Sequence, residues 1–305
     1  MRVSPRIEKA YENAPIRKLT PGSRYVFFSD CHRGYGGWND NFAGNQNICF
    51  HALQYYYDNG YTYVEIGDGD ELWENRNPER IIEINSHIFW MMRRFHRQNR
   101  LILLWGNHDH RKSRADYVKK HYSTFFNECS RKKEELFDEK CFGEALRMQT
   151  REGYEVFAVH GHQGELLNDY LSPIAGFLVR FLWKPLEKWG VRDPTRPAYN
   201  YQCCERGEKR FRRFTEKYHL LVVCGHTHRP VFPVPGEGNY FNDGSMVHPR
   251  CITAIELSDS SLTLVKWSVC AGKNGVLYVG REVLNGPYPI REYFETEWES
   301  LFEKD

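Results

Sequence analysis

The stretch that decides the fold reads Leu101-Ile-Leu-Leu-Trp-Gly-Asn-His-Asp-His110. Its first four residues are apolar and predict a buried strand, and the glycine and polar residues that follow predict a loop at the end of that strand. Asn107 could bind a hard cation, His108 could move a proton, and Asp109 could orient His108. A simple turn is the alternative, and four other strand ends with polar clusters argue against it.

Those four clusters follow apolar runs at residues 24–29, 61–66, 154–159 and 220–224. They read Asp30-Cys-His32, Gly67-Asp68, His160-Gly-His162 and Gly225-His226-Thr-His228. Side chains two residues apart in an extended segment point to the same side, so Asp30 and His32 could bind one ion while Cys31 points away. Asp68 has two carboxylate oxygens and could bridge two ions.

Three polar residues beside these clusters have two interpretations each. Asp70 and Glu71 are either supporting charges near bound ions or charges at the start of a helix. His162 is either a substrate contact or a loop histidine with hydrogen bonds of its own.

The order of elements predicts a parallel sheet. Helices are predicted over about 45–59 and 78–98, between the first three strands. This β-α-β-α-β order places the loops that follow the strands at one edge of the sheet. The charged segment 111–151 predicts helical pieces without chemistry. Because the ligand candidates spread from Asp30 to His228, one domain is favoured over the two that 305 residues allow.

The composition predicts a soluble cytoplasmic protein. Nine cysteines without a regular framework or a C-x-x-C pair indicate reduced thiols. The first 20 residues lack the apolar core of a signal peptide, and the longest apolar run, 174–183, is shorter than the roughly 20 residues that span a bilayer. A formal net charge of +2 gives no global attraction to nucleic acid or membrane.

In this order, the five motifs resemble those of the calcineurin-like metallophosphoesterase family, over residues 24–230. The resemblance implies an α/β fold, a four-layer sandwich of two mixed β-sheets flanked by α-helices, formed by a single domain over residues 1–305. The segments 239–245, 252–257 and 262–269 would supply antiparallel strands of the second sheet. One ion would be held by Asp30, His32, Asp68 and His228, and the other by Asp68, Asn107, His160 and His226.

The ligand set also has a chemical logic without the family. Imidazole, carboxylate and amide groups without a thiolate suit two divalent ions, Mn²⁺ first, with Fe or Zn²⁺ as alternatives. Two such ions about 3.5–4 Å apart can hold a bridging hydroxide that attacks the phosphorus of a phosphodiester or pyrophosphate. His108 would then stabilise the developing charge or protonate the leaving oxygen.

Within the family, the motifs are closest to the UDP-2,3-diacylglucosamine pyrophosphatase-like group. The matching residues are Asp68-Gly-Asp-Glu-Leu-Trp73, Arg76 and Tyr240-Phe-Asn-Asp-Gly-Ser245. Arg76 would contact a substrate phosphate or would be an exposed arginine at a helix start, and Arg33 and His162 are the other candidate substrate contacts. His162 stands where that group usually has Asp, and His108 stands where many members have Arg.

A helical insert is predicted at about residues 166–218. Its first helix would begin at Ser172-Pro173 and carry an apolar face of Ile174, Phe177, Leu178, Phe181 and Leu182. A second helix over 201–218 would place Arg206, Lys209, Arg210, Arg213 and Lys217 on one side and Phe211, Phe214 and Tyr218 on the other. The insert is a lid for an acyl or nucleotide group, a membrane-surface element, or a hairpin packed on the sheet.

We therefore expect a metal-dependent phosphohydrolase that acts on a phosphate-containing small-molecule or lipid-linked substrate, with peripheral membrane contact through the insert. A UDP-2,3-diacylglucosamine-like or other nucleotide-linked substrate fits this class. One alternative is a nuclease or general phosphoesterase, and the lack of a long basic surface disfavours nucleic acid as the substrate. The other is an inert interaction module, which would have no need for seven ligand candidates and a proton donor.

Overall fold

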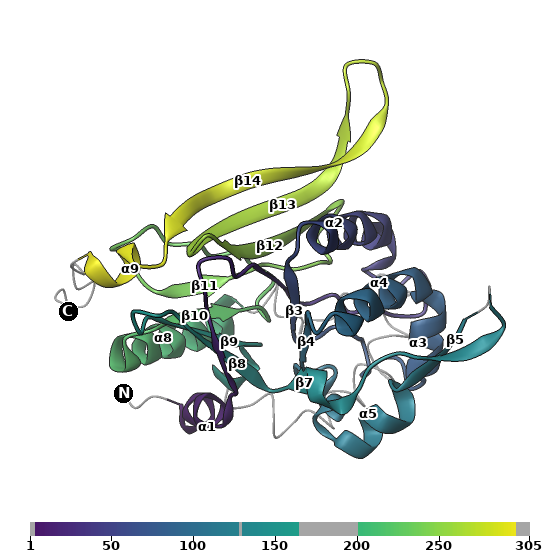
Figure 1. Cartoon of the computed structure of the whole chain (residues 1–305), viewed down its shortest axis with the longest axis horizontal. Helices are drawn as coiled ribbons and strands as arrows, with labels where there is room; N and C mark the ends of the chain where they lie inside the picture. The colour runs from purple at the N-terminus through teal and green to yellow at the C-terminus, as the bar shows by residue number, and fades with distance from the viewer. Residues whose placement is uncertain (1–3, 128–129, 165–200, 297–305) are drawn as a thin grey trace.

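Two mixed β-sheets pack against each other at the centre of the molecule (Figure 1). The computed structural model describes residues 4–127, 130–164 and 201–296. The seven-stranded sheet has the order β14 (Leu277–Pro289), β13 (Ser261–Ala271), β12 (Cys251–Ser258), β2 (Tyr25–Phe28), β3 (Thr62–Ile66), β4 (Leu101–Leu104) and β7 (Phe142–Gly143). The five-stranded sheet has the order β1 (Ile16–Lys18), β8 (Ala145–Gln149), β9 (Glu155–Val159), β10 (Leu221–Cys224) and β11 (Tyr240–Asn242).

Helices cover the outer faces of both sheets, which gives the four layers that the resemblance implies (Figure 1). The helices on the seven-stranded side include α2 (Gln46–Asp58) and α4 (Ser86–Arg97), and those on the five-stranded side are α1 (Pro5–Asn13) and α8 (Tyr201–Tyr218). The other helices among the described residues are α3 (Pro78–Ile84), α5 (Ala115–His121), α9 (Glu292–Glu295) and the short 3-10 helices η1 (Ala43–Asn45), η2 (His110–Ser113), η3 (Glu139–Cys141) and η4 (His162–Gly164).

The alternation of side chains along the strands builds the layers. In β9, Val156 and Ala158 pack in the core between the sheets, whereas Phe157 and Val159 pack under the outer helices. All four are fully buried, because successive strand residues face opposite sides and this strand is covered on both. The apolar run in the sequence therefore reflects a strand between two layers.

The strands predicted before the polar clusters are all present as β2, β3, β4, β9 and β10. Strands β2, β3 and β4 are parallel, and so are β9 and β10, as the element order predicts for the first three. The helix predicted over 201–218 is also present, and Phe211 and Phe214 are buried against the five-stranded sheet. The predicted helix that begins at Ser172-Pro173 lies outside the described residues.

Three sequence expectations are wrong. The single helix predicted over 78–98 is divided into α3 and α4 at Asn85, whose side-chain amide donates to the carbonyls of Ile81 and Gly34. Such side-chain bonds to the backbone compete with helical bonding. The segment 111–151 contains η2 and α5 but also the hairpin of β5 (Thr124–Asn127) and β6 (Lys132–Glu135) and the strands β7 and β8.

The third difference concerns the C-terminal strands. β11 pairs in parallel with β10, so it extends the five-stranded sheet without being antiparallel. β12 and β13 are antiparallel as expected, but β12 pairs with β2 and belongs to the seven-stranded sheet. The physical reason is that β2 has a second edge opposite β3, and β12 covers this edge and buries β2 in the interior of the sheet.

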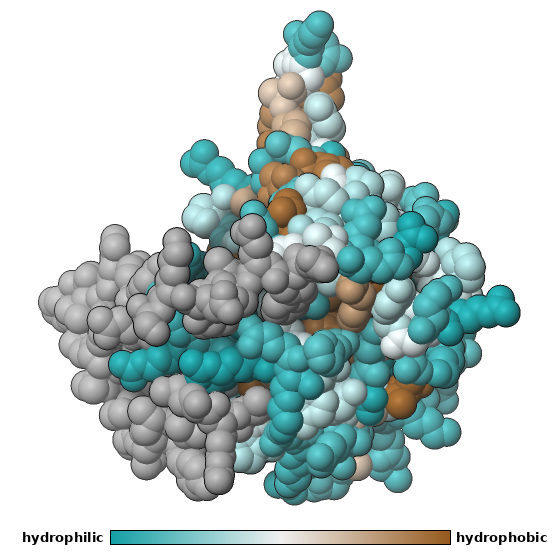
Figure 2. All heavy atoms as spheres, turned by 90° about the vertical axis from the view of Figure 1, so that its left-hand side faces the viewer, coloured by the Kyte–Doolittle hydropathy of each residue, from teal (hydrophilic) through white to brown (hydrophobic). Residues whose placement is uncertain are grey.

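The far parts of β13 and β14 form a two-stranded arm that projects from the body (Figures 1 and 2). Six large apolar side chains of β13, β14 and the turn between them are exposed: Val269, Val276, Leu277, Tyr278, Val283 and Leu284. Within the described part of the chain, no helix combines the length and the apolarity that crossing a bilayer requires.

Candidate metal centre

Five loops that follow strands bring polar side chains to one place where the two sheets meet. Asp30 and His32 follow β2, Asp68 follows β3, Asn107 follows β4, His160 follows β9, and His226 and His228 follow β10. Strands that run in parallel end at the same edge of a sheet, so their following loops gather there. The structure therefore brings all seven predicted ligands together, and their role as ligands stays a prediction.

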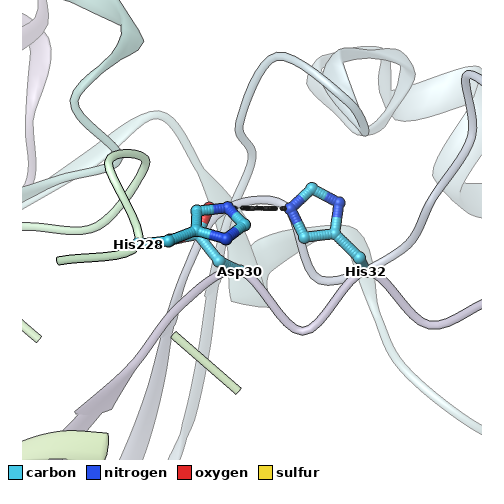
Figure 3. A group of neighbouring side chains, drawn as sticks. All are labelled: Asp30, His32 and His228. Atoms are coloured by element: carbon cyan, nitrogen blue, oxygen red, sulfur yellow. Dashed lines mark hydrogen bonds and ion pairs between the residues drawn. The ribbon is translucent and has the colours of Figure 1, made fainter. Parts of the chain in front are cut away.

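The first group consists of Asp30, His32 and His228, whose side chains point toward one another (Figure 3). His228 Nε2 lies 3.2 Å from Asp30 Oδ1 and 3.3 Å from His32 Nε2, and His32 Nε2 lies 3.7 Å from Asp30 Oδ1. Ligand atoms about 2.0–2.2 Å from one ion lie roughly 3.0–3.6 Å from each other. The spacing and the donor types of this group fit a divalent cation.

The second group consists of Asp68, His160 and His226, with Asn107 beside it. His160 Nε2 lies 3.1 Å from both Asp68 Oδ2 and Asn107 Oδ1. His160 Nδ1 lies 2.8 Å from the carbonyl oxygen of Ile66, which requires a proton on Nδ1 and leaves Nε2 as the atom that faces the group. This arrangement also fits a cation.

Asp68 lies between the two groups. Its Oδ2 atom is 3.1 Å from His160 Nε2 and 3.9 Å from His32 Nε2, and its Oδ1 atom accepts a hydrogen bond from the His108 backbone at 2.8 Å. One carboxylate thus faces both groups, as the prediction of a bridging residue requires.

The backbone of these loops is strained where the side chains converge. Positive φ angles occur at five of the seven ligand candidates: Asp30 (53°), His32 (48°), Asp68 (51°), His226 (70°) and His228 (56°). This region is uncommon for residues other than glycine, and strain of this kind concentrates at functional sites. The backbone of His32 donates to the Asp68 carbonyl at 2.8 Å, which holds two of these strained loops against each other.

Glycines allow the loops to approach so closely. A Cβ atom on Gly67 would lie 2.6 Å from His160 Nδ1, and one on Gly225 would lie 2.1 Å from Ser29 Oγ. Neither distance is possible between real atoms, so the glycine before each cluster is required by the geometry of the centre.

His108 lies beside the two groups and is held by side-chain contacts. Its Nδ1 atom is 2.7 Å from Glu71 Oε2, and its ring stacks on Trp73 with a centroid distance of 3.8 Å. The same Glu71 oxygen lies 3.0 Å from His32 Nδ1. Glu71 therefore orients both a ligand candidate and the proton donor candidate.

Electrostatics favour a protonated His108. Burial alone would lower its pKa, but the negative charges of Glu71 and Asp68 outweigh burial and raise it. The same balance raises the pKa of His160 to about 9, with Asp68 as the main partner. Burial and two neighbouring histidines lower the pKa of His162 well below its usual range, so His162 is neutral.

The loops of this centre lie within a match to a known protein family. A family model described as calcineurin-like phosphoesterase matches residues 23–230, more than half of the chain. The chain belongs to this family. The match covers the loops from Asp30 to His228 that carry every ligand candidate of the centre.

Two solved structures resemble the chain at low sequence identity. The chain is similar to Vps29 from Chaetomium thermophilum at 9% identity, with a TM-score of 0.38 and coverage of 86% of this chain and 96% of that chain. It is similar to a protein assigned as a 5'-nucleotidase from Staphylococcus aureus, solved in complex with alpha-ketoglutarate, at 11% identity and a TM-score of 0.36, with coverage of 86% and 54%. No curated protein matches the sequence.

Two predicted roles do not hold in this phosphoesterase. Asp109 does not orient His108: its oxygens accept hydrogen bonds from the Gly106 backbone at 2.7 Å and the Gly69 backbone at 3.1 Å, and from Lys112 Nζ at 2.8 Å. It fastens the loop after β4 to the loop after β3. The orienting carboxylate is Glu71, which the sequence presented only as a supporting or helix-start charge.

Arg33 is the second correction. Its guanidinium is buried and forms two hydrogen bonds with Glu65, at 2.6 and 2.8 Å, and one with Asp70 at 2.7 Å. A guanidinium that is 1% exposed and saturated by two carboxylates cannot reach a substrate, so the predicted substrate contact is wrong. The position of Arg33 directly after His32 concealed this structural role.

The other two substrate candidates differ in exposure. Arg76 is exposed in the loop that leads from Asp68 to α3. His162 is buried, and its ring centre lies 5.4 Å from that of His160 and 5.8 Å from that of Trp105. A direct substrate contact stays a prediction for both.

Proposed function

We propose that this calcineurin-like phosphoesterase is a dinuclear-metal phosphohydrolase. The observation that carries the proposal is that Asp68 faces both candidate ion groups while Glu71 and Trp73 fix the ring of His108 beside them. An inert module would have no use for an oriented imidazole next to two clusters of ligands.

We assign the residues of the centre to two metal sites and one proton donor. Asp30, His32, Asp68 and His228 would hold one ion, and Asp68, Asn107, His160 and His226 would hold the other. When bound, the two ions would lower the pKa of water and neutralise charge on the phosphoryl oxygens. His108 would give a proton to the leaving oxygen from Nε2, because Glu71 contacts Nδ1 and Trp73 restricts rotation of the ring.

For the substrate we propose a phosphodiester or pyrophosphate linked to a nucleotide or lipid, of the UDP-2,3-diacylglucosamine kind, with Mn²⁺ as the native metal. The motif from Asp68 to Trp73 and the exposed Arg76 support this class, since a guanidinium pairs well with phosphate. We further propose one cytoplasmic domain over residues 1–305 whose insert at 166–218 selects the substrate and contacts the membrane surface. A general phosphoesterase or nuclease is the second candidate.

Hydrolysis by metal-stripped protein tests the proposal. Mn²⁺, Zn²⁺ or Fe²⁺ is added back, and the substrates are an acylated UDP-sugar, a small aryl diester, an aryl monoester, and single- and double-stranded DNA. We expect metal-dependent turnover, fastest on the UDP conjugate. His108→Ala prepared in the same way controls for a contaminating phosphatase. Preference for DNA or the monoester would support the second candidate, and no turnover despite two bound ions would leave the interaction module.

A further inference from the structure

The segment Tyr240–Ser245, which the proposed chemistry leaves without a role, lies directly against the first ion group. Ser245 Oγ donates to the carbonyl of Asp30 at 3.2 Å. Asn242 Nδ2 donates to the carbonyl of Gly225 at 2.5 Å, and it lies 3.1 Å from Thr227 Oγ1. The segment therefore supports both loops that carry the first group, the one after β2 and the one after β10.

Asp243 in this segment reaches the ligand candidate Asp30 through one hydroxyl group. Ser29 Oγ lies 2.5 Å from Asp30 Oδ2 and 2.6 Å from Asp243 Oδ1. All three residues are fully buried. The contact crosses from the end of β2 in one sheet to the end of β11 in the other.

The number of protons available to these two contacts shows whether both carboxyl groups can be ionised. A serine hydroxyl has one proton to donate, and an ionised carboxylate has none. If Asp30 and Asp243 were both ionised, one of the two short contacts would join two acceptors without a proton between them. One of the two carboxyl groups must therefore carry a proton.

Asp30 is the ionised member. Its Oδ2 atom also accepts a hydrogen bond from the His226 backbone at 2.7 Å, and its Oδ1 atom faces the imidazoles of His32 and His228. The outer oxygen of Asp243, Oδ2, is buried and has no hydrogen-bond partner among the described residues. A buried carboxylate with an unpaired oxygen is costly, whereas a neutral carboxylic acid in that place is far less so.

We propose that Asp243 is a neutral carboxylic acid that positions Asp30: Asp243 donates to Ser29 Oγ, and Ser29 donates to Asp30 Oδ2. The inference rests on the proposed metal centre for its purpose. Burial and the negative charge of Asp30 raise the pKa of Asp243 well above its usual range, against the opposing effect of the Ser29 hydrogen bond.

The chain of donors explains how one oxygen of Asp30 is kept for the ion. Oδ2 receives two hydrogen bonds, from Ser29 and from the His226 backbone, so it is occupied. Oδ1 is then the oxygen that points to the two imidazoles. An ionised Asp243 would compete with Asp30 for the single proton of Ser29 and would remove this asymmetry.

Three variants test whether Asp243 acts as a neutral hydrogen-bond donor or as an ionised carboxylate. Asp243→Asn keeps the size and provides an amide N–H for Ser29, Asp243→Ala removes the donor, and Ser29→Ala breaks the chain. Asp116→Asn is the matched control, because Asp116 is an exposed carboxylate that pairs with Arg114. The readouts are Mn²⁺ binding by calorimetry and the infrared carbonyl stretch of a protonated carboxyl group in metal-free protein.

We expect the carbonyl band in the unmodified protein and in Asp116→Asn, and its loss in Asp243→Asn. Affinity for one of two Mn²⁺ ions should stay within about threefold in Asp243→Asn and fall about 10–100-fold in Asp243→Ala and Ser29→Ala, the usual effect of removing a group that orients a ligand. A band that survives in Asp243→Asn would overturn the inference, as would equal weakening by Asn and Ala. If Asp243→Ala does not fold, the Asn and Ser29 variants still decide. Failure of the proposed function is distinguishable, because the unmodified protein would then bind no Mn²⁺, or bind it without turnover, while the band remains.

Discussion

Glu71→Gln is the most informative single substitution in the centre. The side chain keeps its size and one oxygen that can accept from His108 Nδ1 and His32 Nδ1, now 2.7 and 3.0 Å from Glu71 Oε2, but it loses the negative charge. A hydrogen bond to a charged group contributes about 1.5–3 kcal/mol and a neutral one about 0.5–1.5 kcal/mol. Each contact should therefore weaken by about 1–1.5 kcal/mol, which is about tenfold.

The two contacts should appear in different measurements. The weaker hydrogen bond to His108 should lower kcat about tenfold at saturating Mn²⁺. The weaker hydrogen bond to His32 should weaken Mn²⁺ binding about tenfold. Glu71 makes the largest contribution that raises the pKa of His108, so this pKa should be lower in the variant. As the pH rises, the variant should therefore lose activity at a lower pH than the unmodified enzyme. This sign follows because a general acid acts in its protonated form.

The matched control is Glu79→Gln. Glu79 also pairs with a histidine ring, since its Oε1 atom lies 2.6 Å from His121 Nδ1, and His121 is the last residue of α5 and belongs to neither ion group. Steady-state kinetics from pH 5 to 10 and Mn²⁺ titration are compared for the three proteins. An unchanged kcat with an unmoved alkaline limb in Glu71→Gln would refute the orienting role.

Four further changes have definite expected outcomes. Asp68→Ala should lose both ions and all activity in metal analysis, and two ions per active chain would contradict the bridging position. His108→Ala should keep its metals while kcat falls about 10²–10⁴-fold; an equal loss for good and poor leaving groups would argue for charge stabilisation. Arg33→Ala removes the guanidinium that pairs with the buried carboxylate of Glu65 and one of the two cations that pair with Asp70, so it should lower the free energy of unfolding by about 3–5 kcal/mol in urea, and a loss below 1 kcal/mol would contradict this role. Arg206→Glu with Lys209→Glu, both exposed on α8, should raise KM for an anionic substrate more at low salt than at 0.5 M, and an unchanged KM would remove the substrate role of that face.

The sequence predicted the parts of the molecule that follow local rules. The strands before each polar cluster could be found because they are apolar on both faces, as β9 is between two layers. The ligand candidates could be found because each follows such a strand. The division at Asn85 could not, because it depends on the carbonyl of Gly34, which is distant in sequence.

The roles of carboxylates were harder to predict because they depend on the neighbour that each one meets. Both Glu71 and Asp109 lie within three residues of a ligand candidate, yet Glu71 contacts the His108 ring and Asp109 accepts from backbone amides. Arg33 was misassigned for the same reason, since its partner Glu65 lies inside a strand where a charge is unexpected. The placement of β12 beside β2 likewise depends on which sheet edge is open.

The meeting of both sheets at the centre has a mechanical consequence. Asp30, His32, Asp68 and Asn107 belong to the seven-stranded side, and His160, His226 and His228 to the five-stranded side. Each proposed ion therefore has ligands from both, so it would act as a clamp across the sandwich. Every ion that binds only the folded chain adds stability that grows with its free concentration. Sliding one sheet along the other by about one ångström would pull both clamps apart, so the rigidity of the core sets the precision of the chemistry.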